Sequence, residues 1–194
     1  MTAMRGRASS VRDRGDGTVL RVGGRPELEA AIMEVARANR FPVPRVHEVL
    51  PDALVLQRIE GPLMSAQLGR RPWLLRRHMR TLVELHDRLH AIALEGRSIV
   101  HFDLHPENVV MSADGPVVID WTNAHAGDPE ADLALTWLIL ETSAGMPGRV
   151  AARAFRSAAG RDRVERGVDA AAAYRLADPH VTDDERAAVR RVLG

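Results

Sequence analysis

The chain has 194 residues, enough for one large or two small packed units with a sizeable core. Its 45% hydrophobic and 27% charged residues are typical of a globular protein, and the net charge of +1 gives no electrostatic footprint for nucleic acid. Cysteine is absent, which excludes disulfides and thiolate chemistry, and lysine is absent too. Without an apolar signal sequence or an apolar run of ~20 residues, we expect a cytoplasmic protein with no membrane or nucleic-acid partner.

The first 60 residues predict a small, mainly antiparallel sheet with one helix. Pro26 stands at the first position of that helix, and Leu28, Ile32 and Val35 are expected to form its apolar face. A Glu-Gly-Pro breaker follows, so we predict one lobe at residues 1–60 and a second at 61–194. The expected elements are strands at 18–22, 46–50 and 53–59 and a helix at 26–38.

The rest of the chain predicts mainly helices. A long amphipathic helix is expected at 72–92, where His86 and His90 have a spacing that can bind zinc. No third ligand is evident, so we predict that both histidines pack on the flank of the helix. Asp128 is expected to cap a helix that is apolar nearly all round and therefore central, in which Asp132 would be a buried charge that requires a partner. Further helices are expected at 149–159, 168–177 and 183–193, the last with a Thr182-x-x-Glu185 capping box.

Residues 99–121 give the clearest indication of function. Two β-branched runs flank an Asp114-Gly115 pair, which predicts a hairpin that places Asn108 opposite Asp120. An amide oxygen and a carboxylate side by side are ligands that suit Mg²⁺. Just before the hairpin, His101-x-Asp103-x-x-x-x-Asn108 has the spacing of a kinase catalytic loop. In such a loop Asp103 would take the proton of an attacking hydroxyl, while Asn108 and Asp120 hold a cation on the transferring phosphate.

The motif extends beyond this loop. It reads His101-Phe-Asp-Leu-His-Pro-Glu-Asn108, then Ile119-Asp-Trp121, then Gly127-Asp-Pro-Glu-Ala-Asp-Leu-Ala134. This pattern resembles the aminoglycoside phosphotransferase and choline-kinase-like family of small-molecule kinases, with Phe102 and Glu107 where glycine is usual. The resemblance implies an α+β, two-lobed protein-kinase-like fold, with a small antiparallel-sheet N-lobe that has one helix and a larger, mainly helical C-lobe. It also implies transfer of the γ-phosphate of ATP or GTP, with Mg²⁺, to a hydroxyl of a small molecule.

By position, the resemblance implies roles for residues outside the motif. Arg21 stands where the family has a phosphate-contacting lysine, and Glu29 stands where the family has the glutamate that pairs with it. Since arginine presents a planar fork where lysine presents a compact ammonium, this exchange changes the geometry. Asp132 is expected to bond the backbone of the catalytic loop. The remaining expected contributors are Ser9 and Ser10 in a nucleotide-covering loop, Gln57 and Ile59 at the hinge beside the adenine, and His101 and His105 as supporting residues.

Two other functions remain open. On an extended segment, His101, Asp103 and His105 would share one face and could form the zinc site of a metallohydrolase, although that leaves Asn108 and Asp120 unexplained. A degenerate kinase that binds a ligand without transfer is indicated by Arg21 and the short, glycine-poor N-terminus. Residues 149–194 carry ten arginines against seven acids, which counts mildly against a cationic aminoglycoside as acceptor.

Overall fold

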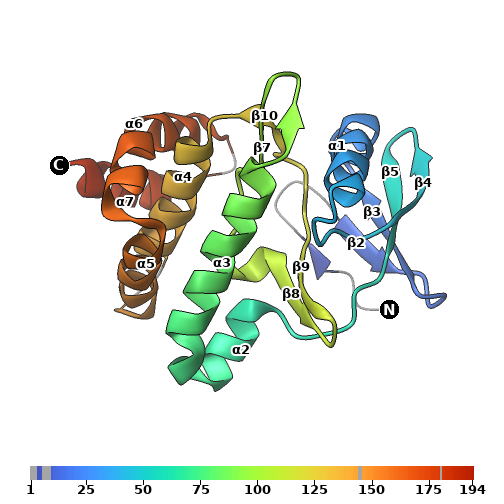
Figure 1. Cartoon of the computed structure of the whole chain (residues 1–194), viewed down its shortest axis with the longest axis horizontal. Coiled ribbons are helices and arrows are strands. Elements are labelled where there is room, and N and C mark those ends of the chain that lie inside the picture. The colour runs from blue at the N-terminus through green and yellow to red at the C-terminus, as the bar shows by residue number, and fades with distance from the viewer. Residues whose placement is uncertain (1–3, 6–9, 144–145, 180) are drawn as a thin grey trace.

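The computed structural model describes residues 4–5, 10–143, 146–179 and 181–194, and it divides into a sheet region and a helical region (Figure 1). A five-stranded antiparallel sheet has the order β1-β2-β3-β5-β4, and α1 packs against β4 and β5. The predicted combination of an antiparallel N-terminal sheet and a helical C-terminal part is confirmed. The elements of the sheet region are β1 (Met4–Arg5), β2 (Ser10–Asp13), β3 (Thr18–Val22), α1 (Pro26–Ala38), β4 (Val46–Leu50) and β5 (Ala53–Gln57).

The buried face of α1 differs from the prediction. Leu28 is 42% exposed, whereas Glu29, Ile32 and Met33 are buried. The helix is turned in this way because Glu29 forms an ion pair with Arg21 of β3 inside the lobe. The predicted apolar face is therefore wrong at Leu28 only: Ile32 is buried and Val35 packs on the core as expected, while the ion pair with Arg21 turns Glu29 inward.

The helical region contains six helices among the described residues, with α4 at its centre in contact with α3, α5, α6 and α7 (Figure 1). The helix α2, the short turn before α3 and the three-stranded sheet β10-β7-β6 were not predicted. Helix α6 begins seven residues earlier than expected because Gly160, with φ of 92°, allows it to follow α5 directly. The capping box of Thr182 and Glu185 is confirmed. The bounds are α2 (Met64–Arg70), α3 (Leu75–His90), β6 (Ala93–Leu94), β7 (Arg97–Val100), β8 (Val109–Ser112), β9 (Gly115–Val118), β10 (His125–Gly127), α4 (Pro129–Thr142), α5 (Met146–Ala159), α6 (Arg161–Ala177) and α7 (Asp183–Leu193).

The hairpin β8-β9 forms as predicted, but its register is shifted by one residue. Ser112 pairs with Gly115, and the backbone N–H of Ile119 donates to the carbonyl of Asn108 at 2.9 Å. Ile119, and not Asp120, therefore lies opposite Asn108. A shift of one residue would normally turn a side chain to the other face of the ribbon. The Asp120 side chain does not follow this alternation, because its φ of 60° ends the extended conformation of the strand.

The hydrophobic core is continuous across the two regions, and one aromatic side chain lies where they meet. Trp121, 1% exposed, packs edge-to-face on Phe41 from the segment after α1 and on His101 in the loop between β7 and β8. In the helical region, α6 approaches α4 so closely that a Cβ on Gly167 would lie 2.0 Å from a backbone oxygen of α4. Within the described residues, every helix is too short or too polar to be a transmembrane segment.

Candidate active site

The loop between β7 and β8 is held by a buried carboxylate. Asp132 of α4, fully buried, accepts the backbone N–H groups of His101 and Phe102, both at 2.9 Å. Phe102 has a φ of 58°, which is uncommon for a residue other than glycine, and its ring packs edge-to-face against Tyr174. The two hydrogen bonds and the ring contact stabilise this bend, which turns Asp103 toward solvent.

Two histidines of α3 stabilise the negative charge of Asp132. His90 Nε2 lies 2.9 Å and His86 Nδ1 3.5 Å from Asp132 Oδ2. Burial opposes ionisation, but these histidines outweigh it and hold the pKa of Asp132 well below its usual value. A third neighbour of the two histidines could not be identified from the sequence, because Asp132 reaches them only through the packing of α4 on α3. In the part of the chain that the structure describes, this is the only group of three histidine or acidic side chains close enough to hold a metal, and Asp132 is already bonded to the loop.

Asp103 is positioned by two residues that follow it in the chain. The Asn108 amide nitrogen donates to the Asp103 backbone carbonyl and to its Oδ2, both at 2.8 Å, and His105 Nε2 lies 3.3 Å from Oδ1. Burial raises the pKa of Asp103, but the contacts with His105 and Asn108 more than offset it, so the pKa lies below its usual value. Asp103 is therefore ionised at neutral pH, and the Asn108 amide oxygen is left as the atom that can bind a cation.

A chain of polar contacts connects the sheet region with Asp120. Arg21 Nη1 lies 2.7 Å from Glu29 Oε2, and each of these side chains is 3% exposed. The other end of the guanidinium donates to the Thr122 hydroxyl, which in turn donates to Asp120 Oδ1 at 2.6 Å. Burial raises the pKa of Glu29 to about 7, against the opposing effect of Arg21. Thr122 could not be identified as a site residue from the sequence, because no local motif includes a threonine two residues after an aspartate.

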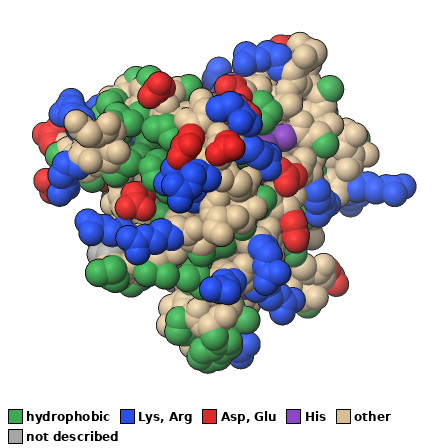
Figure 2. Space-filling view, turned by 60° about the vertical axis from the view of Figure 1, so that its left-hand side comes forward, with side chains coloured by type: hydrophobic (Ala, Val, Ile, Leu, Met, Phe, Trp, Pro, Cys, Tyr) green, Lys and Arg blue, Asp and Glu red, His purple; other side chains and the backbone are tan. Residues whose placement is uncertain are grey.

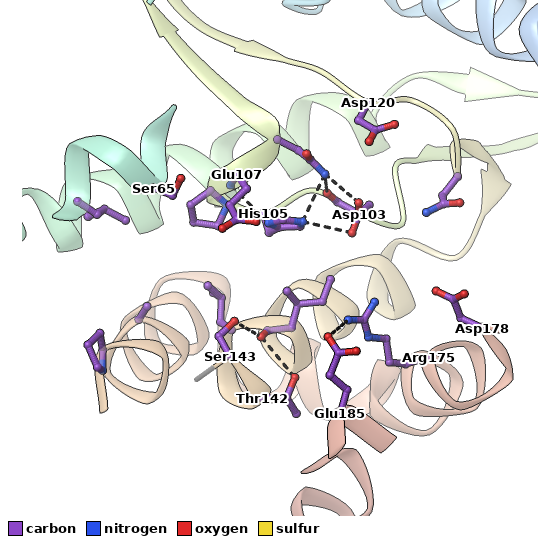
Figure 3. A pocket seen from close by; sticks show the side chains of 18 of the residues that line it. Ser65, Asp103, His105, Glu107, Asp120, Thr142, Ser143, Arg175, Asp178 and Glu185 are labelled. Carbon is purple, nitrogen blue, oxygen red and sulfur yellow. Dashed lines mark hydrogen bonds and ion pairs between the residues drawn. The ribbon is translucent and has the colours of Figure 1, made fainter. Parts of the chain in front are cut away.

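A cavity of about 1310 Å³ opens in front of the loop, and Asp103, Asn108 and Asp120 line it together. Glu107 and His105 line the same wall. Figure 3 shows this wall facing a second one formed by the helical region. The side chains labelled on that second wall are Thr142, Ser143, Arg175, Asp178 and Glu185.

Other predicted site residues lie outside this cavity's lining. Ser10 pairs with Val22 in the sheet, Ser9 lies outside the described residues, and Gln57 is exposed and accepts a hydrogen bond from the Arg45 backbone. Ile59 is half-buried after the end of β5. The structure therefore does not bring Ser10, Gln57 or Ile59 to the carboxylates at the loop.

His101 does not share a face with Asp103 and His105. The positive φ of Phe102 breaks the alternation expected of an extended segment, and the His101 ring lies fully buried against Trp121. Burial lowers the pKa of His101, so the ring is neutral at pH 7. The expectation that these three side chains could form a zinc site is therefore wrong.

Comparison with known proteins agrees with this geometry. The model of the phosphotransferase enzyme family matches residues 88–174, which contain Asp103, Asn108, Asp120 and Asp132. No curated protein sequence matches significantly. Among solved structures, the chain is similar to a thermostable mutant of aminoglycoside phosphotransferase APH(4)-Ia, with 17% identity and a TM-score of 0.70 over 98% of this chain and 92% of that one.

Two more solved structures have the same fold. A choline/ethanolamine kinase family protein from Mesorhizobium loti is 15% identical, with a TM-score of 0.66 over 99% of this chain and 87% of that one. A streptomycin-ATP-APH(2")-IIa ternary complex is 11% identical, with a TM-score of 0.63 over 99% and 86%. These findings confirm the predicted resemblance and the two-lobed, protein-kinase-like fold.

Proposed function

We propose that this protein is a phosphotransferase that moves the γ-phosphoryl group of ATP or GTP to a hydroxyl of a small molecule. The observation that carries this proposal is the ionised Asp103, fixed by Asn108 in a cavity that Asp120 also lines. The family match over the loop and the ATP present in one structural neighbour support it. In this proposal residues 1–60 form the nucleotide-binding lobe, and residues 61–194 bind the acceptor.

The donor atoms at the site fit Mg²⁺. The Asp120 carboxylate and the Asn108 amide oxygen are hard oxygen ligands, and these two residues would hold the ion. When bound, Mg²⁺ neutralises charge on the transferring phosphate. Arg21, fixed by Glu29 and directed at Thr122 beside Asp120, would position the phosphates from the sheet side.

The proposed reaction is an in-line displacement at the γ-phosphorus. The acceptor hydroxyl oxygen forms a new P–O bond while the bond to the β,γ-bridging oxygen breaks, and the nucleoside diphosphate leaves with that electron pair. The proton of the hydroxyl passes to a carboxylate oxygen of Asp103. Because Asp103 is ionised and already held by Asn108 and His105, little reorganisation is needed at the moment of reaction.

The test is Asp103→Ala, with radiolabelled γ-phosphate transfer measured against a panel of hydroxylated metabolites and antibiotics. We expect transfer to fall at least about 100-fold, the scale of general-base catalysis, while nucleotide affinity stays within about twofold. Asp114→Ala, in the exposed hairpin turn, is the matched control and should retain transfer. Equal loss of transfer and nucleotide binding in the Asp103 variant would contradict the assigned role.

One observation favours a second function, binding without transfer. The Arg21 guanidinium is already engaged by Glu29 and Thr122, so a phosphate must compete with protein partners for it. Thermal unfolding with and without millimolar Mg-nucleotide separates the two functions. A rise in the melting temperature supports the kinase proposal, because a ligand that binds only the folded state stabilises it. No rise favours the degenerate binding protein.

A further inference from the structure

The cavity in front of Asp103 is large, and part of its lining, called the apolar wall below, consists of apolar side chains from α2 to α5. Its volume of about 1310 Å³ includes the space at Asn108 and Asp120 that the proposed function assigns to Mg²⁺ and phosphate. It is above the ~300–1000 Å³ of most small-molecule sites, so a two-carbon amino alcohol beside them would still leave much of it unfilled. Asp103 and Asp120 lie on one side. Helices α2 to α5 supply apolar side chains to the rest of the lining, namely Leu68, Leu75, Ile139, Leu140, Met146 and Val150.

Exposed apolar side chains gather at the edge of this cavity. Met146 and Val150, both in the lining, are 68% and 42% exposed, and Trp73, next to the lining residue Pro72, is 75% exposed. Figure 2 shows hydrophobic side chains on the protruding lower end of the molecule, where α2 and the start of α3 lie. Scattered exposed apolar residues are ordinary, but a group of them continuous with a cavity indicates a binding surface.

The charged side chains of the lining are mostly acidic, with five carboxylates and one arginine. Arg175 and Glu185 lie 3.5 Å apart and offset each other. Asp178 is the one other acid that the helical wall contributes, and Glu107 lies beside the catalytic loop. These acids suit a polar or cationic head, and the apolar side chains of α2 to α5 are left for an uncharged body.

We infer that the acceptor is an amphiphilic alcohol. Its hydroxyl-bearing head lies at Asp103, and its apolar body lies along the wall that ends at Val150 and Met146. Naming this molecule the acceptor rests on the proposed phosphotransferase function, whereas its chemical class rests on the cavity alone.

The test uses alkyl β-D-glucosides, which keep one hydroxylated head and vary only the apolar tail. Calorimetric titration of methyl, hexyl and octyl glucoside, below micelle-forming concentrations and without nucleotide, should show affinity rising about two- to threefold per methylene, somewhat below the full hydrophobic transfer value. The same series is then offered as acceptors with Mg-ATP. Streptomycin serves as the hydrophilic polycationic probe and should bind more weakly than octyl glucoside.

Two variants locate the tail. In Met146→Glu/Val150→Glu the octyl compound should bind no more tightly than the methyl compound, because a charge stands where the tail would lie. The matched control is Val49→Glu on β4, a valine of nearly equal exposure (44%) outside the cavity lining, which should leave the dependence on tail length unchanged. Four results would each overturn the inference. They are an affinity that does not change with tail length, a dependence on tail length that persists in the double variant, an equal loss of this dependence in the control, and tighter binding of streptomycin than of octyl glucoside.

Two results separate this inference from the proposed function. Tail-dependent binding at this wall without any phosphate transfer would refute the phosphotransferase proposal and leave the assigned ligand chemistry standing. Transfer of phosphate to streptomycin, with no change in affinity as the glucoside tail lengthens, would refute the assigned ligand chemistry and leave the phosphotransferase proposal standing.

Discussion

Replacing Asp132 by asparagine tests the support of the catalytic loop most directly. The carboxylate accepts the N–H groups of His101 and Phe102 on its two oxygens and contacts His90 and His86. Asparagine has nearly the same shape but only one acceptor oxygen. Whichever way its amide is oriented, an NH₂ group faces at least one buried backbone N–H, and the negative charge between the histidines is lost.

The expected cost follows from these contacts. Removing one partner of a buried charged group costs about 3–5 kcal/mol, because the groups left behind are desolvated and unpaired. Asp132 is fully buried, so little solvent screening reduces that figure. For a chain of this length, such a loss lowers the melting temperature by about 10 °C. Phosphate transfer should fall as well, since the bend at Phe102 that turns Asp103 to the cavity loses its anchor.

Urea unfolding at pH 7, followed by tryptophan fluorescence, to which the buried Trp121 contributes, measures this free energy. The matched control is Asp128→Asn, four residues earlier on the exposed cap of the same helix, where asparagine caps equally well and the change should stay within about 0.5 kcal/mol. A loss below about 1 kcal/mol in Asp132→Asn, with an unchanged slope against urea, would refute the reasoning.

The pH dependence provides a second readout of the same carboxylate. The pKa of Asp132 in the folded state lies below its unfolded value, so its stabilisation is complete above that unfolded value and is lost as pH falls through the folded one. The Asp132→Asn variant should therefore lose less stability on acidification below pH 4 than the unchanged protein.

Three further changes test other parts of the structure. Burial raises the pKa of Glu29 to about 7, so the folded chain holds more protons than the unfolded chain between pH 4.5 and 7 and loses up to about 3 kcal/mol as pH rises through that window. Glu29→Gln should flatten this slope in urea titrations at pH 5 and 8, and an unchanged slope would contradict the assignment. Gly167→Ala should cost about 2–3 kcal/mol in urea unfolding, because its methyl group would overlap the backbone of α4, whereas Gly69→Ala in open space should be neutral or stabilising by up to about 1 kcal/mol. Arg21→Lys should cost about 1.5–3 kcal/mol, measured by thermal unfolding, because one ammonium cannot bond both Glu29 and Thr122, and an unchanged melting temperature would show that the bridge contributes nothing.

Sequence alone predicted the features that depend on neighbours along the chain. The Asp128-Pro129 helix start and the capping box at Thr182 are set by side chains that bond backbone groups two or three residues away. The motif from His101 to Ala134 resembles that of small-molecule kinases, and this resemblance implied the kinase-like fold. These signals are local, and so they were visible before any packing was known.

Tertiary structure decided how those pieces meet. The inward turn of Glu29 in place of Leu28 depends on the angle between α1 and β3, and the meeting of Asp132 with His86 depends on the packing of α4 on α3. The contact between Thr122 and Arg21 joins residues 101 positions apart in the chain, and neither periodicity nor a motif indicates which residues meet over such a separation. The apolar wall of the cavity likewise comes from four helices. Hydrogen bonds within a turn are fixed by adjacent residues, whereas contacts between distant elements depend on the orientations that burial of the whole core selects.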